Sequence, residues 1–183
     1  MKKVAVFGNA GGGKSTVARR LAEITGLPLI VLDFLQFPEG YRSDRDGGGK
    51  ISDDQYTKLH SEIIGRAEWI IDGYGSVASA WDRFAVADTL VYVDLPLSMH
   101  YWGVTKRLVK GLFKTPPGWP ENSPVLQSSL SSYQIVWLCH TRLTPRYRKL
   151  VTESPSKHVH HLRSYAQMSR FLEAVQRDYR GRT

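Results

Sequence analysis

The sequence predicts an α/β fold in which a parallel sheet is covered by helices on both faces. Short apolar runs recur along the chain, stretches with helical periodicity separate them, and no internal repeat or domain linker interrupts the alternation. Continuously apolar runs are typical of strands buried on both faces, and a helical crossover is the usual connection between parallel strands. With 183 residues, 42% of them hydrophobic, we expect residues 1–183 to form one domain.

Five strands are expected, four from apolar runs and the last from a weaker histidine-rich run: residues 3–7, 29–32, 69–71, 89–93 and 158–162. The first helix is predicted over residues 15–24, because Val17, Leu21 and Ile24 share one helical face before Gly26. Ser52 and Gln55 form a capping box for a second helix that ends near Ala67.

The second half of the chain is predicted to be mainly helical. Ser98 can cap a helix that runs to about Leu112, and a long helical stretch over residues 125–151 contains Pro145, where a bend is expected. Residues 165–178 close the chain as a helix. Glycines and prolines predict loops over residues 36–50 and 113–124, and we expect the 36–50 loop to be mobile.

A complete phosphate-binding loop follows the first strand and opens the first helix. Its residues are Gly8, Asn9, Ala10, Gly11, Gly12, Gly13, Lys14 and Ser15, with Thr16 directly after. Glycines let backbone N–H groups approach an anion closely, and the start of the helix adds unpaired N–H groups and a positive dipole end. Lys14 supplies a point charge for the phosphates, and the Ser15 hydroxyl can bind Mg²⁺. The motif predicts a bound nucleoside triphosphate without naming the reaction.

Three aspartates end expected strands, at the sheet edge where ligands bind in open α/β folds. Asp72 follows the third strand, where a carboxylate helps to hold the Mg²⁺ shell. Asp33 follows the second strand and can orient either the hydroxyl group of an acceptor or a metal-bound water. Asp94 precedes Leu95-Pro96, so a role in a turn or cap is the favoured interpretation for it.

With these features in place, the chain resembles the adenylate-kinase-like P-loop kinases, most closely the group called topology-modulation proteins or adenylate-kinase-related kinases. The resemblance covers nearly the whole chain. It is carried by five segments beyond the phosphate loop: residues 32–33, 70–75, 87–89, 119–124 and 143–148.

The resemblance implies a three-layer P-loop NTPase fold, whose five-stranded parallel sheet has the order 2-3-1-4-5, and a helical basic lid within about 107–148. It also implies transfer of the γ-phosphoryl group of ATP, with Mg²⁺ as cofactor, to a small nucleotide-like acceptor. The residues after Asp72 are Gly73-Tyr74-Gly75-Ser76 where adenylate kinases usually have Gly-Phe-Pro-Arg, so the acceptor stays open. The next arginine, Arg83, and Trp119 in the proline-rich loop are candidate acceptor-binding residues.

Arginines of the expected lid are candidate catalytic residues, together with Lys14 and Asp33. Arginine binds phosphate oxygens in pairs and neutralises the charge of a transferring phosphoryl group. Arg107 lies where lids of this family begin, and Arg142 and Arg146 are four residues apart, so they share a face if the helix is unbroken. Arg148 is expected to point elsewhere, and a solvated basic face remains the alternative for each arginine.

Charge divides the chain into two unlike halves. Residues 1–96 carry 11 Lys and Arg against 13 Asp and Glu, whereas residues 97–183 carry 14 against 4. A basic half indicates either arginines that close over a triphosphate, which we favour, or an ATP-binding protein associated with nucleic acid. A GTPase is disfavoured, because the fourth strand runs into Val93-Asp94-Leu95-Pro96 without an Asn-Lys-x-Asp motif.

The remaining signals concern location and packing. No apolar stretch approaches the ~20 residues that span a bilayer and no signal peptide fits the start, so we expect a cytoplasmic protein with no membrane partner. Cys139, the only cysteine, is expected to be buried and inert. Core packing is the expectation for Trp81, Trp102 and Trp137.

Overall fold

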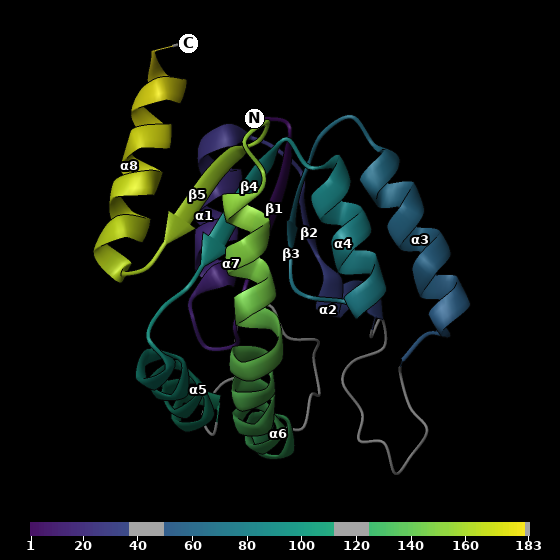
Figure 1. Ribbon diagram of the computed structural model, residues 1–183, viewed down its shortest axis with the longest axis vertical. Helices are drawn as coiled ribbons and strands as arrows, with labels where there is room; N and C mark the ends of the chain where they lie inside the picture. The colour runs from purple at the N-terminus through teal and green to yellow at the C-terminus, as the bar shows by residue number, and fades with distance from the viewer. Residues whose placement is uncertain (37–49, 112–124, 182–183) are drawn as a thin grey trace.

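In a computed structural model, which describes residues 1–36, 50–111 and 125–181, the strands form one parallel sheet of order β2-β3-β1-β4-β5 (Figure 1). This is the predicted fold class and strand order. The strands are β1 (Lys3–Gly8), β2 (Leu29–Val31), β3 (Trp69–Asp72), β4 (Thr89–Val93) and β5 (His158–Leu162). The helices are α1 (Lys14–Thr25), α2 (Leu32–Gln36), α3 (Asp53–Gly65), α4 (Val77–Val86), α5 (Leu97–Gly111), α6 (Val125–Leu138), α7 (Thr144–Thr152) and α8 (Tyr165–Arg180).

Helices cover both faces of the sheet, and the alternation of side chains along β1 divides the core between them. Val4 and Val6 pack in a cluster with Leu21 of α1 and Phe171 of α8. Ala5, Phe7 and their neighbours face the opposite way. There they meet side chains from three helices: Ile63, Phe84 and Tyr147. The central strands are therefore buried on both faces, which is why β1, β3 and β4 read as largely apolar runs.

The long helix predicted over residues 125–151 is divided by a π-helical segment, Cys139–Leu143. In this wider turn the Thr144 N–H bonds to the Cys139 carbonyl, and the Thr141 hydroxyl donates to the carbonyls of Trp137 and Leu138. Pro145 lies in the first turn of α7, where the N–H that proline lacks is not needed. The break therefore precedes the proline at which a bend was expected.

Two further differences concern Asp33 and helix α4. Asp33 lies in the short helix α2 and not at the tip of β2, which ends at Val31. Helix α4, which was not predicted, begins at a reciprocal capping box between Ser76 and Ser79. The capping box predicted at Ser52 and Gln55 is confirmed at the start of α3.

The expectation that the tryptophans pack in the core is wrong for two of them. Trp102 on α5 is 65% exposed and Trp137 on α6 is 57% exposed. Trp81 does pack inside, edge-on against Phe84. Tryptophan is amphipathic, so its presence in a helix does not by itself tell which face is buried.

Two predicted segments lie outside the described residues: residues 37–49 of the loop predicted over 36–50, and residues 112–124 of the predicted lid. Trp119, a candidate acceptor-binding residue, lies in the second segment. Among the described helices, none has the length and apolar character needed to span a bilayer.

Candidate functional site

The phosphate loop connects β1 to α1 at the carboxyl edge of the sheet. Gly8, Gly11 and Gly13 all have positive φ, at 136°, 72° and 86°. A side chain on Gly8 would also collide with the Val93 carbonyl of the neighbouring strand. The first turn of α1 contains no acidic residue, so its N–H groups and positive dipole end are left for an anion.

Lys14, the first residue of α1, folds back over the loop. Its Nζ donates to the backbone carbonyl of Asn9 at 2.7 Å. Burial lowers the pKa of Lys14, and the carboxylate of Asp72 opposes this as the strongest raising influence. A bound phosphate would replace the single carbonyl partner with a charged one, which makes the ammonium group a strong phosphate ligand.

The register of the sheet brings the two candidate carboxylates to the loop. Asp72 pairs with Val6 of β1, two residues before Gly8, and with Val31 of β2, two residues before Asp33. Asp72 is 2% exposed, and its Oδ1 has no hydrogen-bond partner. A buried carboxylate oxygen without a partner is costly, and a metal ion or its bound water would satisfy it. Together with the hydroxyl of Ser15, near the start of α1, Asp72 therefore fits a Mg²⁺ site.

The two carboxylates and two cations of this edge influence one another. Burial raises the pKa of Asp33, the charge of Asp72 raises it further, and Lys14 and Arg107 oppose this. For Arg107, burial lowers the pKa and Asp33 raises it. Four sequence-predicted residues from four different elements, Lys14, Asp33, Asp72 and Arg107, thus lie in one electrostatic cluster. Three of these residues, Lys14, Asp33 and Arg107, have shifted pKa values, and perturbed groups that converge in this way are typical of a functional site.

Arg107 also connects the two helices below the sheet in Figure 1. It lies on α5 and donates from Nη2 to the Ser132 hydroxyl of α6 at 2.7 Å. Its half-buried guanidinium is therefore held between the helices.

Arg83 is fully buried on α4. Its Nη2 donates to the carbonyls of Gly73 and Tyr74 at 3.2 and 3.4 Å, and its Nη1 lies 3.4 Å from His60 Nε2. It supports the loop that follows Asp72 from within. All three of these contacts are with the protein itself. A direct contact between Arg83 and an acceptor stays a prediction.

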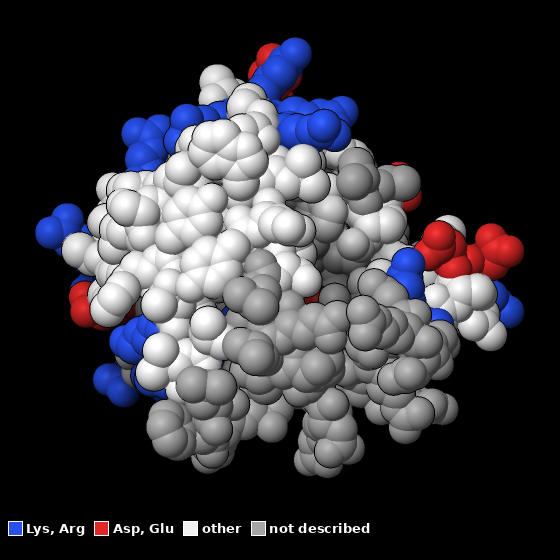
Figure 2. Space-filling view, turned by 90° about the horizontal axis from the view of Figure 1, so that it is seen from below, with Lys and Arg blue, Asp and Glu red and all other residues white. Residues whose placement is uncertain are grey.

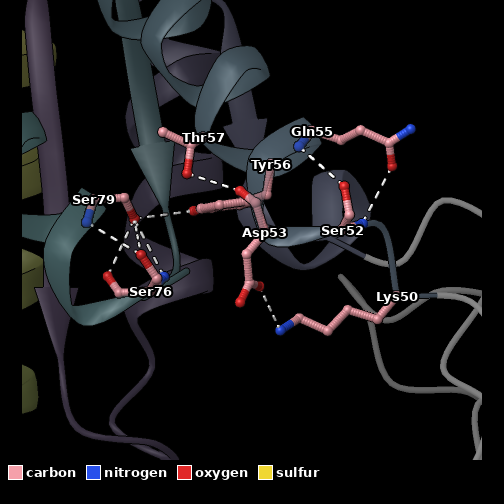
Figure 3. A network of polar contacts seen from close by, with 8 residues as sticks. All are labelled: Lys50, Ser52, Asp53, Gln55, Tyr56, Thr57, Ser76 and Ser79. Carbon is pink, nitrogen blue, oxygen red and sulfur yellow. Dashed lines mark hydrogen bonds and ion pairs between the residues drawn. The ribbon is translucent and has the colours of Figure 1, made fainter.

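The same loop is also fixed from the side of α3. Figure 3 shows Tyr56 of α3 reaching Ser79 of α4, with the two hydroxyl oxygens 3.3 Å apart. Gly75 has a φ of 66°, and any side chain there would overlap the Tyr56 hydroxyl. These contacts hold the loop that follows Asp72 between α3 and α4.

A π-helical segment lies between α6 and α7, so Arg142 and Arg146 do not lie on one unbroken α-helix. Arg142 lies in that segment and is exposed. Arg146, in α7, holds its guanidinium 5.5 Å from the ring centre of Trp81 on α4. Neither residue forms a described contact with the phosphate loop. Their roles in catalysis stay predictions that require the segment to move.

Asp94 has a larger structural role than the sequence indicated. It accepts hydrogen bonds from Arg148 Nε at 2.8 Å and Nη2 at 3.1 Å, and its Oδ2 lies 2.9 Å from His161 Nε2. Burial alone would raise the pKa of Asp94, but the bonds from Arg148 and His161 outweigh it and hold the pKa below its ordinary value. Through Arg148 and His161, Asp94 ties α7 and β5 to the end of β4. Arg148 does point away from its neighbouring arginines, as predicted.

Cys139 is buried, as expected, with 7% exposure. Burial raises the pKa of its thiol to about 11, so the reactive thiolate is scarce at neutral pH.

Comparisons with known proteins find solved structures that share the fold. No family model matches the chain, and no curated protein matches it. Among solved structures, a shikimate kinase from Acinetobacter baumannii in complex with shikimate aligns with a TM-score of 0.57 and 17% identity, covering 100% of this chain and 95% of that one. A shikimate kinase from Bacteroides thetaiotaomicron aligns with a TM-score of 0.54 and 11% identity, covering 97% of each chain. The part of the chain that the structure describes therefore has the fold of P-loop kinases.

Proposed function

We propose that the protein is an ATP-dependent phosphotransferase of the adenylate-kinase-related type, which moves the γ-phosphoryl group of ATP to a small nucleotide-like acceptor. One observation carries the proposal: the phosphate loop and its Lys14 share an electrostatic cluster with two buried or half-buried carboxylates, Asp33 and Asp72. A loop that only binds a nucleotide needs no second carboxylate beside its lysine. A kinase needs one carboxylate for the metal and one for the acceptor.

In the proposed reaction, a bond forms between an acceptor oxygen and the γ-phosphorus as the bond from that phosphorus to the β–γ bridging oxygen breaks. Asp33 orients the acceptor hydroxyl and takes its proton, a role favoured by the raised pKa that burial gives it. Lys14 and the loop N–H groups hold the β- and γ-phosphates. Arg107 neutralises charge on the transferring group, with Arg142 and Arg146 joining it when the segment that carries them closes.

Mg²⁺ is the cofactor that the site fits, through Ser15 and the unpartnered oxygen of Asp72. When bound there, it would act as a Lewis acid that neutralises charge on the phosphates. We expect the protein to act in the cytoplasm on free nucleotides.

The second candidate is an ATP-binding protein associated with nucleic acid, with little kinase activity. The basic second half of the chain favours it, with 14 Lys and Arg against 4 Asp and Glu over residues 97–183. Such binding would weaken steeply with salt, because it would depend on displaced counterions.

The discriminating experiment measures ADP release from Mg-ATP with a panel of nucleoside monophosphates, nucleosides and shikimate-like alcohols. Stimulation by one acceptor of at least tenfold over ATP alone would support the kinase and name its substrate class. If no acceptor stimulates ADP release and the protein binds DNA with a steep dependence on salt, the second candidate replaces the first.

A further inference from the structure

The phosphate loop is held by more than the strand and helix that it joins. Asn9 occupies a position that the loop motif leaves free, yet its side chain is 4% exposed and bonded at both ends. Its Nδ2 donates to the Val136 carbonyl of α6 at 2.9 Å, and its Oδ1 accepts from the Ala10 N–H at 2.7 Å. Its backbone carbonyl is the partner of Lys14. One residue therefore links the loop lysine to α6.

Helix α5 holds the same loop at a second point. Gly103 packs so closely on the loop that a Cβ there would overlap the Gly11 carbonyl oxygen and lie 2.8 Å from its carbon. One turn earlier, the Nδ1 of buried His100 lies 2.9 Å from the Ala10 carbonyl oxygen. Gly103 lies outside the phosphate-loop motif, and nothing in its local sequence marks it.

The two helices are fastened to each other, so the two contacts belong to one unit. Arg107 bonds to Ser132, and the hydroxyls of Thr105 and Tyr133 lie 2.6 Å apart. The rings of Tyr101 and Tyr133 stack, with centres 5.9 Å apart. Figure 1 shows α5 and α6 side by side at the end of the molecule where the loop lies.

We propose that Asn9 and Gly103 are positioning residues that couple the phosphate loop to the α5–α6 pair, so that ATP binding and the position of α6 depend on each other. The inference rests on the proposed function. To meet a phosphate, Lys14 leaves the Asn9 carbonyl, and the Asn9 side chain carries the adjustment to Val136. Helix α6 continues through the π-helical segment to Arg142 and Arg146. The bond between Asn9 and Val136 thereby connects nucleotide binding to Arg142 and Arg146, the two arginines that must move.

The first test is Gly103→Ala, with Gly65→Ala as a matched control. Both glycines are helical, but a Cβ on Gly65 meets nothing within 4 Å. Because a Cβ on Gly103 would overlap the Gly11 carbonyl oxygen, Gly103→Ala is expected to lower the Tm. Gly65→Ala is expected to keep or raise the Tm, because alanine is the better helix former. Coupling predicts that calorimetry finds the Kd for Mg-ATP raised at least tenfold in Gly103→Ala and unchanged in Gly65→Ala.

The second test is Asn9→Ala, which stays informative if Gly103→Ala does not fold. Its control is Gln134→Ala, an exposed residue two positions from Val136 on α6. The probe is the fluorescence of Trp137, the neighbour of Val136, assigned by its loss in Trp137→Phe. Wild type and Gln134→Ala are expected to show the same Trp137 signal change on saturation with Mg-ATP. Asn9→Ala is expected to show less than half of it, with a raised Kd.

The possible failures are distinguishable. If the wild type binds no Mg-ATP, the proposed function falls and this inference falls with it. If the wild type binds Mg-ATP but its Trp137 signal stays flat, or both Asn9→Ala and Gly103→Ala match their controls in Kd, the coupling is refuted and the proposed function stands.

Discussion

Asp72→Asn separates the functional interpretation of the site from a structural one. The substitution keeps the shape of the side chain and removes a buried charge whose Oδ1 has no partner. An unsatisfied buried polar group costs roughly 1–3 kcal/mol, so a carboxylate kept only for structure would be poorly chosen here. We expect the Tm to stay unchanged or rise by a few degrees. We expect kcat/KM to fall by at least ~10–100-fold, the usual effect of disturbing groups around a metal site.

The same substitution has a directional effect on the pH profile. Burial raises the pKa of Asp33, and the charge of Asp72 is the next largest cause of that increase. Removing this charge lowers the pKa of Asp33, so the acid limb of the residual kcat/KM profile should move to lower pH. The assay is acceptor-dependent ADP release between pH 5 and pH 9, with calorimetric unfolding of the same samples.

The control for Asp72→Asn is Asp82→Asn, which removes an exposed carboxylate from α4. It is expected to leave the rate, the Tm and the pH profile unchanged. A large fall in Tm for Asp72→Asn, with kcat/KM kept within twofold, would refute the reasoning, because Asp72 would then be structural.

Two further predictions concern arginines that follow the π-helical segment. Arg146→Ala should lower kcat by up to ~10³-fold while changing the Kd for Mg-ATP little, and turnover equal to wild type would remove Arg146 from the mechanism. Arg148→Ala should lower the free energy of unfolding by about 1 kcal/mol near neutral pH, a modest value because the Arg148 side chain is 57% exposed while Asp94 is 6% exposed. The folded-state pKa of Asp94 is lowered, so this stabilisation is present above the ordinary aspartate pKa and lost as the pH falls through the folded value. Unfolding curves of wild type and Arg148→Ala that differ as much at pH 3 as at pH 7 would contradict the assignment.

The sheet could be predicted from the sequence because its signals are local. A strand buried on both faces must be apolar throughout, and the phosphate loop needs glycine wherever φ is positive, as at Gly8 and Gly13. Asp33 and Asp72 could be placed together because the ends of parallel strands meet at one edge. The strand order came from the resemblance, since no local signal states which strands are neighbours.

The rest depended on contacts between distant segments. The partner of Asp94 is Arg148, 54 residues away, and no spacing rule connects them. Gly103 sits inside an ordinary helix, where its close approach to Gly11 leaves no trace in the sequence. Nothing in the sequence distinguishes the π-helical segment, Cys139–Leu143, from an α-helix, so a break before Pro145 could not be foreseen.

The central claim is that the loop from Gly8 to Ser15 holds the phosphates of a nucleotide, with Lys14 as its cation. Titration calorimetry of the wild type and Lys14→Ala with Mg-ATP tests it most directly. We expect a saturable heat at one ATP per chain for the wild type and a Kd at least a hundredfold weaker for Lys14→Ala. No heat with the wild type, or the same isotherm for both proteins, would contradict the claim.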